Sequence, residues 1–582
     1  MNQTKLITRL EGFRSRNSIN HCYVNKDIYR LLYCKEMYLV AYNNIKSNDG
    51  AETVGSDKTS LHGFCEQWID ELISSFKDES YQPIASRTIY IPKKNGKKRK
   101  LSFPNGKDKI VQEIVRIILE CIYEPTFSNL SHGYRPQRSI HSALAQLETW
   151  KSTTWFIEGD ISACFDEVDH RVLEIILRER IHDERFLRLI NKLLKAGYFD
   201  TEFNFTKSKF GTAQGSTCSP ILANIYLDKL DRFMESIIDR DTKGKYRKQN
   251  PEYACIRHQL NKAKQNHDVT SIKSLSKKLK TLPSVDVMDS TFRRVKYVRY
   301  ADDFLIGIIG DKEYAKQLKL EIKQFLITAL HLKLSEEKTQ ITNAIPDKAN
   351  FLGYQITKRY NHIAILINIK DKIHKLHQSG ICDGRGYPKG ITYLLREPVY
   401  NIIKKGNEIL RGHIVNNQGC SNYYECWRIQ YIIQYSIAKT IARKYDISMK
   451  QVFKKYGNNL TCTYTDAKDK VKTISLALFR TFRRSKDFFK NWILKLKEPI
   501  TYTYKDTNPL SRPCYICGNP QLHKMYHRKK VGRLCLPYPH IVKEMVRINR
   551  RQVCLCNTCF QKVENNELEY NQITKRRKSM SV

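Results

Sequence analysis

Two adjacent aspartates in an apolar setting constrain this chain more than any other feature. Asp302 and Asp303 lie between residues 296–300 (Lys-Tyr-Val-Arg-Tyr) and the apolar run 304–309. β-Branched and aromatic residues on both sides of a short acidic tip predict a β-hairpin that presents both acids at its turn. Neighbouring carboxylates repel each other and are costly to bury unpaired, so a divalent cation would account for the pair. A solvated Asp-Asp turn on a surface hairpin is the alternative.

A second acidic site favours the cation. Residues 155–159 (Trp-Phe-Ile-Glu-Gly) predict a buried strand that ends at Asp160. Two strands that each bring carboxylates to one sheet edge can hold two Mg²⁺ ions about 4 Å apart, which is the geometry of two-metal phosphoryl transfer. We therefore expect Asp160, Asp302 and Asp303 to be catalytic and to bind magnesium.

Between these two sites lies a stretch of small residues, 211–220, which contains Gln214 and Gly215 and precedes an apolar segment that ends at Leu227. A glycine among small residues lets the backbone approach a base or a template strand closely. In this order the three regions resemble the palm of a reverse transcriptase. The resemblance implies an RNA-directed DNA polymerase that binds substrate at Gln214 and Gly215. Its metal ions would activate a primer 3′-hydroxyl and stabilise the pyrophosphate leaving group.

Further segments resemble other blocks of this family, namely 91–101, 107–112, 131–136, 334–339 and 351–354. By similarity, Lys93 and Arg99 lie on a fingers hairpin and bind the phosphates of the incoming dNTP. A solvated basic hairpin that touches the template is the alternative. Lys338 belongs to the block whose lysine lies near the triphosphate. Phe165 would exclude a ribose 2′-hydroxyl and so select dNTPs, although it could also be an ordinary core residue.

The type of reverse transcriptase follows from a polar, basic insertion at 239–290 and from the segments at 421–424, 435–444 and 452–457. These features resemble group II intron-encoded proteins, whose thumb is the maturase domain. Residues 423–444 predict an amphipathic helix. Its apolar positions are Tyr424, Trp427, Tyr431, Ile432, Tyr435 and Ala438. We expect this stripe to be thumb core rather than an RNA-stacking surface, and the basic face that includes Lys439 and Arg443 to contact RNA.

The composition requires a polyanionic partner. The chain has 101 Lys and Arg against 59 Asp and Glu, a formal net charge of +42, which predicts binding through phosphates that salt would weaken. With 582 residues, of which 41% are hydrophobic, several domains are expected. The sequence contains no run of eighteen apolar residues and no apolar signal core near Met1. Residue usage rich in Ile, Lys, Asn and Tyr suits an AT-rich genome, so we expect a mitochondrion, with plastid and bacterial cytoplasm as alternatives.

The cysteines divide into two groups. Eleven of the 17 are scattered, which is typical of a reducing compartment without a disulfide framework. The other six lie near the C-terminus, where Cys514 and Cys517, and Cys556 and Cys559, form two C-x-x-C pairs. This spacing predicts a structural zinc site with four thiolates. Cys535 and Cys554 have no motif partner and are expected to be packing residues.

In the family that the chain resembles, this module is an H-N-H endonuclease that cuts the second DNA strand. By similarity, His527 is the general base of the nuclease and Asn549 is the central asparagine of the motif. Tyr526 and Phe560, however, occupy the positions where the family has histidines that hold the catalytic metal. A phenyl ring cannot bind Mg²⁺, and without the cation the Lewis acid is lost. We therefore expect weak or no cleavage, with an active nuclease that uses other ligands as the alternative.

These observations predict an α+β protein. It would have right-hand polymerase fingers and palm with an antiparallel palm sheet, an α-helical thumb (maturase domain X), and a small ββα or treble-clef-like zinc module. A helix over 61–76 is expected to open the fingers. We expect the chain to be organised as an N-terminal extension (1–85), fingers and palm (86–360, with the 239–290 insertion), a connector (361–390), the thumb (391–497), a linker (498–512), the zinc module (513–565) and a basic tail (566–582).

The function implied by the resemblance is that of a bifunctional intron-encoded protein. It would bind its group II intron RNA to promote splicing, and it would copy that RNA into DNA from a cleaved target DNA end. A non-enzymatic splicing factor with a vestigial polymerase is the main alternative. A retron or retrotransposon polymerase would lack the thumb signature of residues 435–457.

Overall fold

The chain is described here from a computed structural model, and the strands of the described part form five sheets among numerous helices. The predicted mixed α+β class is therefore confirmed. The structure describes all residues except 1–2, 49, 93–95, 97, 201–203, 207, 209, 287–288, 290, 361, 466–469, 501, 503–507, 522, 528–551, 566 and 568–582.

A four-stranded antiparallel sheet lies at the centre of the polymerase region. Its strand order is β6-β7-β3-β8, with β3 (Trp155–Asp160), β6 (Arg294–Tyr300), β7 (Asp303–Ile309) and β8 (Gln340–Asn343). Strands β6 and β7 form the hairpin predicted around the two aspartates, and β3 ends at Asp160 as expected.

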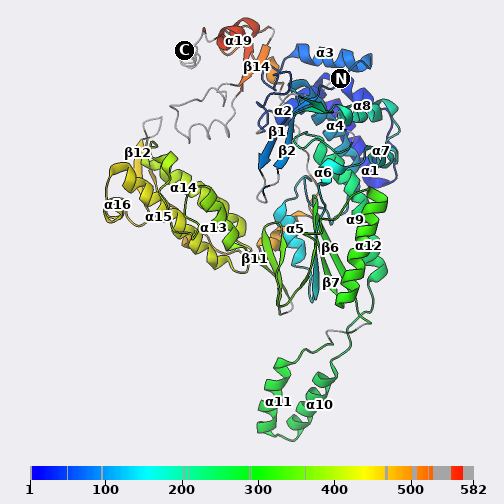
Figure 1. Ribbon diagram of the computed structural model, residues 1–582, viewed down its shortest axis with the longest axis vertical. Coiled ribbons are helices and arrows are strands. Elements are labelled where there is room, and N and C mark those ends of the chain that lie inside the picture. Colours follow the sequence, from blue (N-terminus) through cyan, green and yellow to red (C-terminus); the bar gives the residue numbers. More distant parts are fainter. Residues whose placement is uncertain are drawn as a thin grey trace.

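The two inner strands, β3 and β7, are buried along nearly their whole length, and β7 is apolar after Asp303. Phe304 and Ile306 of β7 belong to a cluster that includes helices α9 (Ser219–Asp241) and α12 (Lys312–Leu330). Leu305 points into a second cluster with α5 (Ile140–Leu147). Figure 1 shows α9 and α12 along one side of the sheet and α5 on the other.

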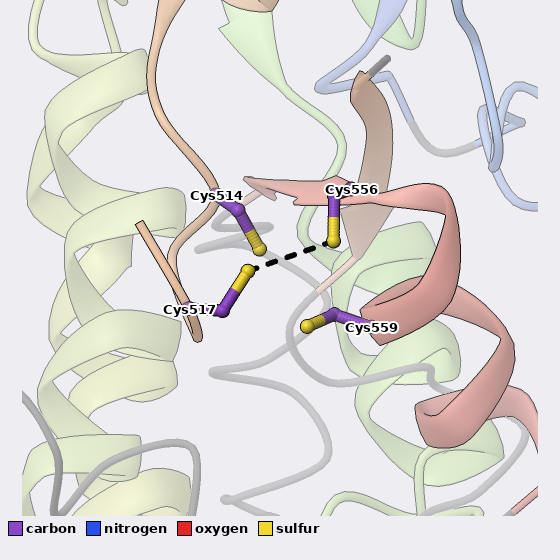
Figure 2. A group of neighbouring side chains, drawn as sticks. All are labelled: Cys514, Cys517, Cys556 and Cys559. Carbon is purple, nitrogen blue, oxygen red and sulfur yellow. Dashed lines mark hydrogen bonds between the residues drawn. The ribbon is translucent and has the colours of Figure 1, made fainter. Parts of the chain in front are cut away.

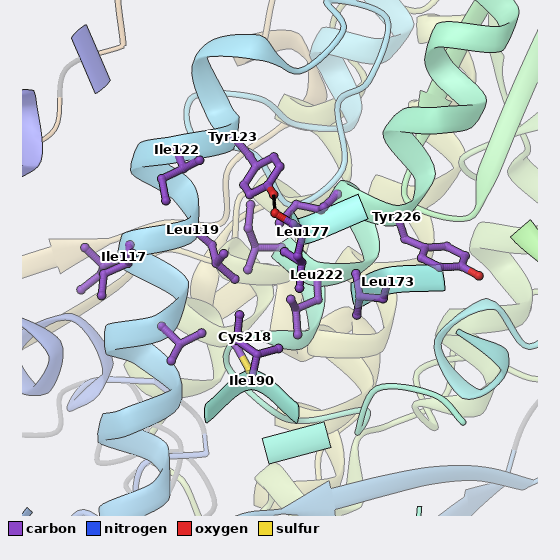
Figure 3. Packing of buried hydrophobic residues seen from close by; sticks show 14 of the residues in the cluster. Ile117, Leu119, Ile122, Tyr123, Leu173, Leu177, Ile190, Cys218, Leu222 and Tyr226 are labelled. Carbon is purple, nitrogen blue, oxygen red and sulfur yellow. Dashed lines mark hydrogen bonds between the residues drawn. The ribbon is translucent and has the colours of Figure 1, made fainter. Parts of the chain in front are cut away.

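The N-terminal part of the chain contains four helices and one hairpin. They are α1 (Gln3–Ile19), α2 (Lys35–Ile45), α3 (Glu66–Lys77) and α4 (Gly106–Tyr123), with β1 (Ser86–Pro92) and β2 (Lys98–Phe103). Helix α4 is buried on nearly all sides, and it packs against α7 (His170–Arg178), α8 (Glu184–Lys195) and α9 (Figure 3). Strands β4 (Tyr198–Phe199) and β5 (Phe205–Thr206) extend the β1–β2 sheet.

The helix predicted over 61–76 begins only at Glu66. Gly63 has a φ of 88°, which no right-handed helix accommodates, and Cys65 pairs with Lys524 in an isolated β-bridge. Residues 61–65 therefore make tertiary contacts instead of the first turn of α3.

The 239–290 insertion forms a helical hairpin. Helix α9 continues into it as far as Asp241, and α10 (Pro251–Gln265) and α11 (Val269–Thr281) follow. None of the described residues of α11 is buried. The hairpin projects away from the rest of the chain (Figure 1).

The predicted connector, 361–390, is half regular structure. Strands β9 (Ala349–Phe351), β10 (Tyr354–Arg359) and β11 (His362–Ile367) form one sheet, and α13 (Ile369–Gln378) follows. The apolar side chains of β11 are buried in the same cluster as the helices after it, so the region joins the thumb to the palm by packing. Only the part after α13, which contains the glycines, is irregular.

The thumb consists of α14 (Val399–Ile414), α15 (Cys426–Tyr445), α16 (Met449–Tyr456), the hairpin β12 (Cys462–Thr465) and β13 (Val471–Ile474), and α17 (Phe488–Lys495). The stripe predicted over 423–444 was right only in part, because Ile432 and Ala438 are buried as expected but three of its aromatic members are exposed. Tyr424, Trp427 and Tyr431 are 65%, 57% and 41% exposed, whereas the aliphatic row that includes Ile429 and Ile433 is buried. The aliphatic row packs against α14, and this leaves the larger aromatic side chains on the outer face.

The C-terminal module contains the antiparallel pair β14 (His523–His527) and β15 (Gln552–Cys556), followed by α19 (Asn557–Glu564). Its strand-strand-helix order agrees with the ββα prediction. Among the described residues, no helix combines the length and hydropathy needed to cross a membrane.

Candidate functional site

Three aspartates meet at one edge of the central sheet. In the register of the antiparallel pair β3–β7, Asp160 lies directly opposite Asp303. Asp302 occupies the β6–β7 turn, and its carbonyl oxygen accepts a hydrogen bond from the backbone N–H of Ile161 at 3.3 Å. The sequence separates Asp160 from the other two by more than a hundred residues, and strand pairing brings them together.

The carboxylates crowd one another electrostatically. Burial raises the pKa of Asp303 to about 7, and the charge of Asp302 and a hydrogen bond with Asp160 add to this effect. Burial also raises the pKa of Asp302, against which the cations Lys338 and Arg99 act. Such mutual repulsion is relieved when a cation binds between the groups.

Lys338 provides the nearest positive charge. Its Nζ donates a hydrogen bond to Asp160 Oδ2 at 2.8 Å, and this bond raises the pKa of Lys338. The preceding loop is tied to the same strand end, because the N–H of Ser335 donates to the carbonyl oxygen of Asp160 at 2.8 Å. The ammonium group is 62% exposed, so it can move without a change in the backbone.

A cavity of about 610 Å³ opens beside the aspartates. Seven of the residues predicted from the sequence line it, namely Arg99, Asp160, Phe165, Gln214, Gly215, Asp302 and Lys338. The ring of Phe165 is half-buried and meets Tyr134 edge to face, with ring centroids 6.1 Å apart. The cavity therefore has cations, carboxylates and an aromatic wall, a combination suited to a nucleoside triphosphate.

The loop with Gln214 and Gly215 is pressed against strand β2. Ser102 donates its N–H to the carbonyl oxygen of Gln214 at 2.7 Å, and a Cβ on Gly215 would lie 2.4 Å from the carbonyl oxygen of Ser102. Gly215 also has a φ of 114°, so only glycine fits there. Gln214 Nε2 donates to Asp166 at 3.1 Å, which fixes the loop beside Phe165.

A buried ion pair supports the aspartate turn, and the sequence analysis missed it. Arg299 and Asp231 are 0% exposed and form two hydrogen bonds at 2.7 and 2.6 Å. Arg299 also donates to the carbonyl oxygen of Ala301 at 2.8 Å. Two features of the sequence could have revealed this pair. Arg299 lies among the buried positions of β6, and Asp231 lies on the buried side of α9.

The turn itself is strained and tightly packed. Ala301 has a φ of 58°, which is unfavourable for a residue with a side chain. A Cβ on Gly133 would lie 2.3 Å from the nitrogen of Ala301, so the turn requires glycine at its neighbour. The carbonyl oxygen of Gly133 accepts a hydrogen bond from Asn224 Nδ2 at 2.8 Å.

A second site lies in the C-terminal module (Figure 2). The Sγ atoms of Cys514, Cys517, Cys556 and Cys559 all lie within 4.8 Å of one another and could hold a metal ion. Four thiolates around a tetrahedral ion, each with a bond of about 2.3 Å, would be about 3.8 Å apart. Burial acts to raise the pKa of Cys514, but the backbone N–H groups of Cys517, Cys556 and Ile516 lower it to about 7. Burial and the neighbouring thiols raise the pKa of Cys556 and Cys559, so the thiolate is favoured at Cys514 and disfavoured at those two residues.

Some predicted residues lie outside the described part of the chain. Lys93, Asn549 and Cys535 are among them, as is the basic tail. His527 pairs with Gln552 through its backbone, and its side chain is not described. Cys554 is buried against Leu510, as expected of a packing residue.

Comparison with known proteins matches two family models. Residues 91–356 match "Reverse transcriptase (RNA-dependent DNA polymerase)", and residues 360–504 match "Type II intron maturase". The group II intron-encoded protein LtrA of Lactococcus lactis subsp. cremoris is 34% identical over 575 residues, which are 92% of this chain and 94% of LtrA. An uncharacterized 91 kDa protein in the cob intron of Schizosaccharomyces pombe is 34% identical over 590 residues, covering 96% of this chain and 72% of that protein. The putative COX1/OXI3 intron 1 protein of Saccharomyces cerevisiae is 32% identical over 597 residues, covering 95% and 70%.

The buried ion pair generates a first prediction. Asp231→Asn would leave the guanidinium of Arg299 buried without an anion, which costs about 3–5 kcal/mol. We expect a clear fall in the melting temperature of the full chain, measured by thermal denaturation.

The control is Glu321→Gln. This change breaks the ion pair of Glu321 with Arg240, whose side chains are 37% and 53% exposed, respectively. It should lower the free energy of unfolding by at most about 1 kcal/mol. Equal shifts in the two variants would show that the Asp231 pair does not carry the stability assigned to it.

Proposed function

Because this chain belongs to the family of group II intron-encoded proteins, we propose that it promotes splicing of its own intron RNA and copies that RNA into DNA. The observation that carries the proposal is the meeting of three carboxylates from two strands beside a cavity lined by Arg99 and Lys338. The reverse transcriptase domain itself implies the use of a divalent metal.

The metal in the polymerase site is Mg²⁺, held by Asp160, Asp302 and Asp303. Carboxylate oxygens are the ligands that Mg²⁺ prefers, and the raised pKa of Asp303, about 7, supports a cation between the groups. When bound, two such ions supply Lewis acidity to the attacking and leaving oxygens of nucleotidyl transfer. Lys338 releases Asp160 to the metal and remains at the cavity as a partner for phosphate.

The cations and the aromatic wall position the dNTP. Arg99 lies on β2 at the cavity and offers a planar fork for phosphate, and Lys93 follows β1 in the sequence. Phe165 lies beside the place of the sugar and excludes a 2′-hydroxyl. Gln214 and Gly215 bring backbone close to the base, as their contact with β2 allows.

The intron RNA binds to basic surfaces of the chain, and the net charge of +42 supports this. The thumb contributes more than charge, because Trp427 and Tyr431 of α15 are exposed, as is Tyr424 in the turn just before it. Exposed aromatic rings can stack on unpaired bases. We assign RNA stacking to these three aromatic residues. The sequence analysis had expected them to belong to the core of the thumb.

Zn²⁺ is the metal of the four-cysteine cluster, where it has a structural role. Soft thiolates in a four-sulfur set select zinc among the common divalent ions.

The target DNA is the remaining partner, because its cleaved 3′-end would prime synthesis. A mitochondrial location is supported by the residue usage, which includes 34 Tyr among 582 residues.

The competing function is that of a splicing factor with a vestigial polymerase. Replacing Asp302 with alanine separates the two, because it removes one magnesium ligand and no RNA-binding residue. We expect primer extension on an RNA template to fall about a hundredfold or more. Splicing of the intron should persist, since it depends on RNA binding.

The matched control is Asp239→Ala, which removes an exposed carboxylate at the end of α9. It should extend primers like the unmodified chain. Absence of extension by the unmodified chain, with splicing intact, would establish the vestigial alternative.

The role of Phe165 can be tested by substrate choice. In Phe165→Ala the cavity gains room for a 2′-hydroxyl, so discrimination against ribonucleotides should fall about tenfold or more. The measurement is the ratio of kcat/KM for dNTP and rNTP. An equal loss with both substrates would mean that Phe165 is only a core residue.

The C-terminal module is a degenerate H-N-H nuclease, because Tyr526 and Phe560 replace two metal ligands expected in the family. We expect weak or no nicking of plasmid DNA by the purified chain with Mg²⁺ or Mn²⁺. Clear nicking that His527→Ala abolishes would refute this and establish an active nuclease with other ligands.

A further inference from the structure

The hairpin of the C-terminal module has two buried faces. Met525 of β14 and Cys554 of β15 belong to the large core shared with the N-terminal helices and the central sheet. Their neighbours Tyr526 and Leu555 point the other way, into the small core of the module around the four cysteines. A strand alternates its side chains, so one hairpin here joins two cores.

Backbone hydrogen bonds fasten the hairpin to the segment before α3. The N–H of Gly63 donates to the carbonyl oxygen of Met525 at 2.9 Å, and the N–H of Met525 donates to the carbonyl oxygen of Phe64 at 3.0 Å. Cys65 and Lys524 continue the pairing as an antiparallel bridge. Residues more than 450 positions apart in sequence are thus paired as neighbouring strands.

Side chains complete the contact. Tyr42 of α2 donates its hydroxyl to Gln552 Oε1 at 2.7 Å, and its ring stacks on Phe64 with centroids 4.1 Å apart. Helix α2 and the segment before α3 therefore both hold this module.

The two residues that depart from the nuclease motif lie in this contact. The ring of His62 is 4.9 Å from that of Tyr526 and 5.2 Å from that of Phe560, and those two rings are 5.9 Å apart. His62 Nε2 also lies 3.1 Å from a carboxylate oxygen of Glu564, and its side chain is 11% exposed. Aromatic rings pack where the family would place ligands of a catalytic cation.

We propose that this module is a brace, and that its zinc ion keeps residues 61–65 of the N-terminal extension paired with the hairpin β14–β15. The ion acts through short stretches of chain. Cys556 lies two residues after Cys554 of the large core, and Cys559 is adjacent to Phe560 at the His62 contact. Removing the ion releases β15 and the start of α19, and the pairing with residues 63–65 opens with them. The inference uses the zinc assignment made above and does not depend on the polymerase chemistry.

Hydrogen exchange on the full chain, read by mass spectrometry, tests the brace directly. Zinc content is measured first, and the ion is then removed with a chelator. Amide exchange in peptides covering 61–66 and 523–527 should become about tenfold faster or more, because both lose cross-strand hydrogen bonds. Peptides from β6 and β7 serve as the internal reference and should stay protected. A chain that contains no zinc as purified, or peptides 61–66 that keep their protection after zinc removal, would overturn the proposal.

Two variants and one control separate the brace from general unfolding. Cys556→Ser should lose zinc and expose both peptides, and Cys22→Ser, at an exposed cysteine outside the cluster, should change neither. His62→Ala should keep its zinc and the protection of 552–564 while exchange at 61–66 rises. Retained protection at 61–66 in His62→Ala would mean that the aromatic contact does not fasten the extension, which refutes the proposal even if Cys556→Ser fails to fold.

Discussion

The antiparallel register of β3 and β7 sets how close the three carboxylates of the polymerase region lie to one another. It sets Asp160 opposite Asp303, next to Asp302, in a partly buried place where the negative charges repel one another. Such an arrangement persists only if other contacts over-determine it. The buried pair of Arg299 and Asp231, and the glycine that admits the strained turn, provide that support from behind the sheet.

Features with a local signature could be predicted from the sequence. Each of these features combines a residue type with a short spacing: the two acid-bearing strands, the C-x-x-C pairs and the loop with Gln214. In the structure, Asp160, Asp302 and Gln214 line one cavity, and the four cysteines form a separate cluster. Strand pairing is non-local, however. No spacing rule links positions so far apart. The prediction that Asp160 lies beside the hairpin therefore came from the resemblance to a family and from the need of neighbouring carboxylates for a shared cation.

Tertiary packing decided the features that the sequence analysis missed. Helix α15 is apolar on more than one side, so two stripes compete for the core. The aliphatic row packs against α14, and the larger aromatic residues remain exposed. Residues 61–65 likewise have an apolar pattern that suits a helix, but pairing with β14 supplies their hydrogen bonds instead. Neither outcome can be read from periodicity, because both depend on a partner elsewhere in the chain.

The two metal sites assigned to the C-terminal module in the proposed function differ in what they require physically. A catalytic Mg²⁺ or Mn²⁺ site needs open coordination positions and contributes little to folding, so its ligands can be exchanged for apolar residues without loss of the fold. Four thiolates around a zinc ion would add to the small hydrophobic core of the module, so losing one of them would destabilise it. Rings at positions 526 and 560 and an intact cysteine cluster are therefore compatible. The packing against His62 gives the altered positions a structural use that ligands to a solvated cation would not provide.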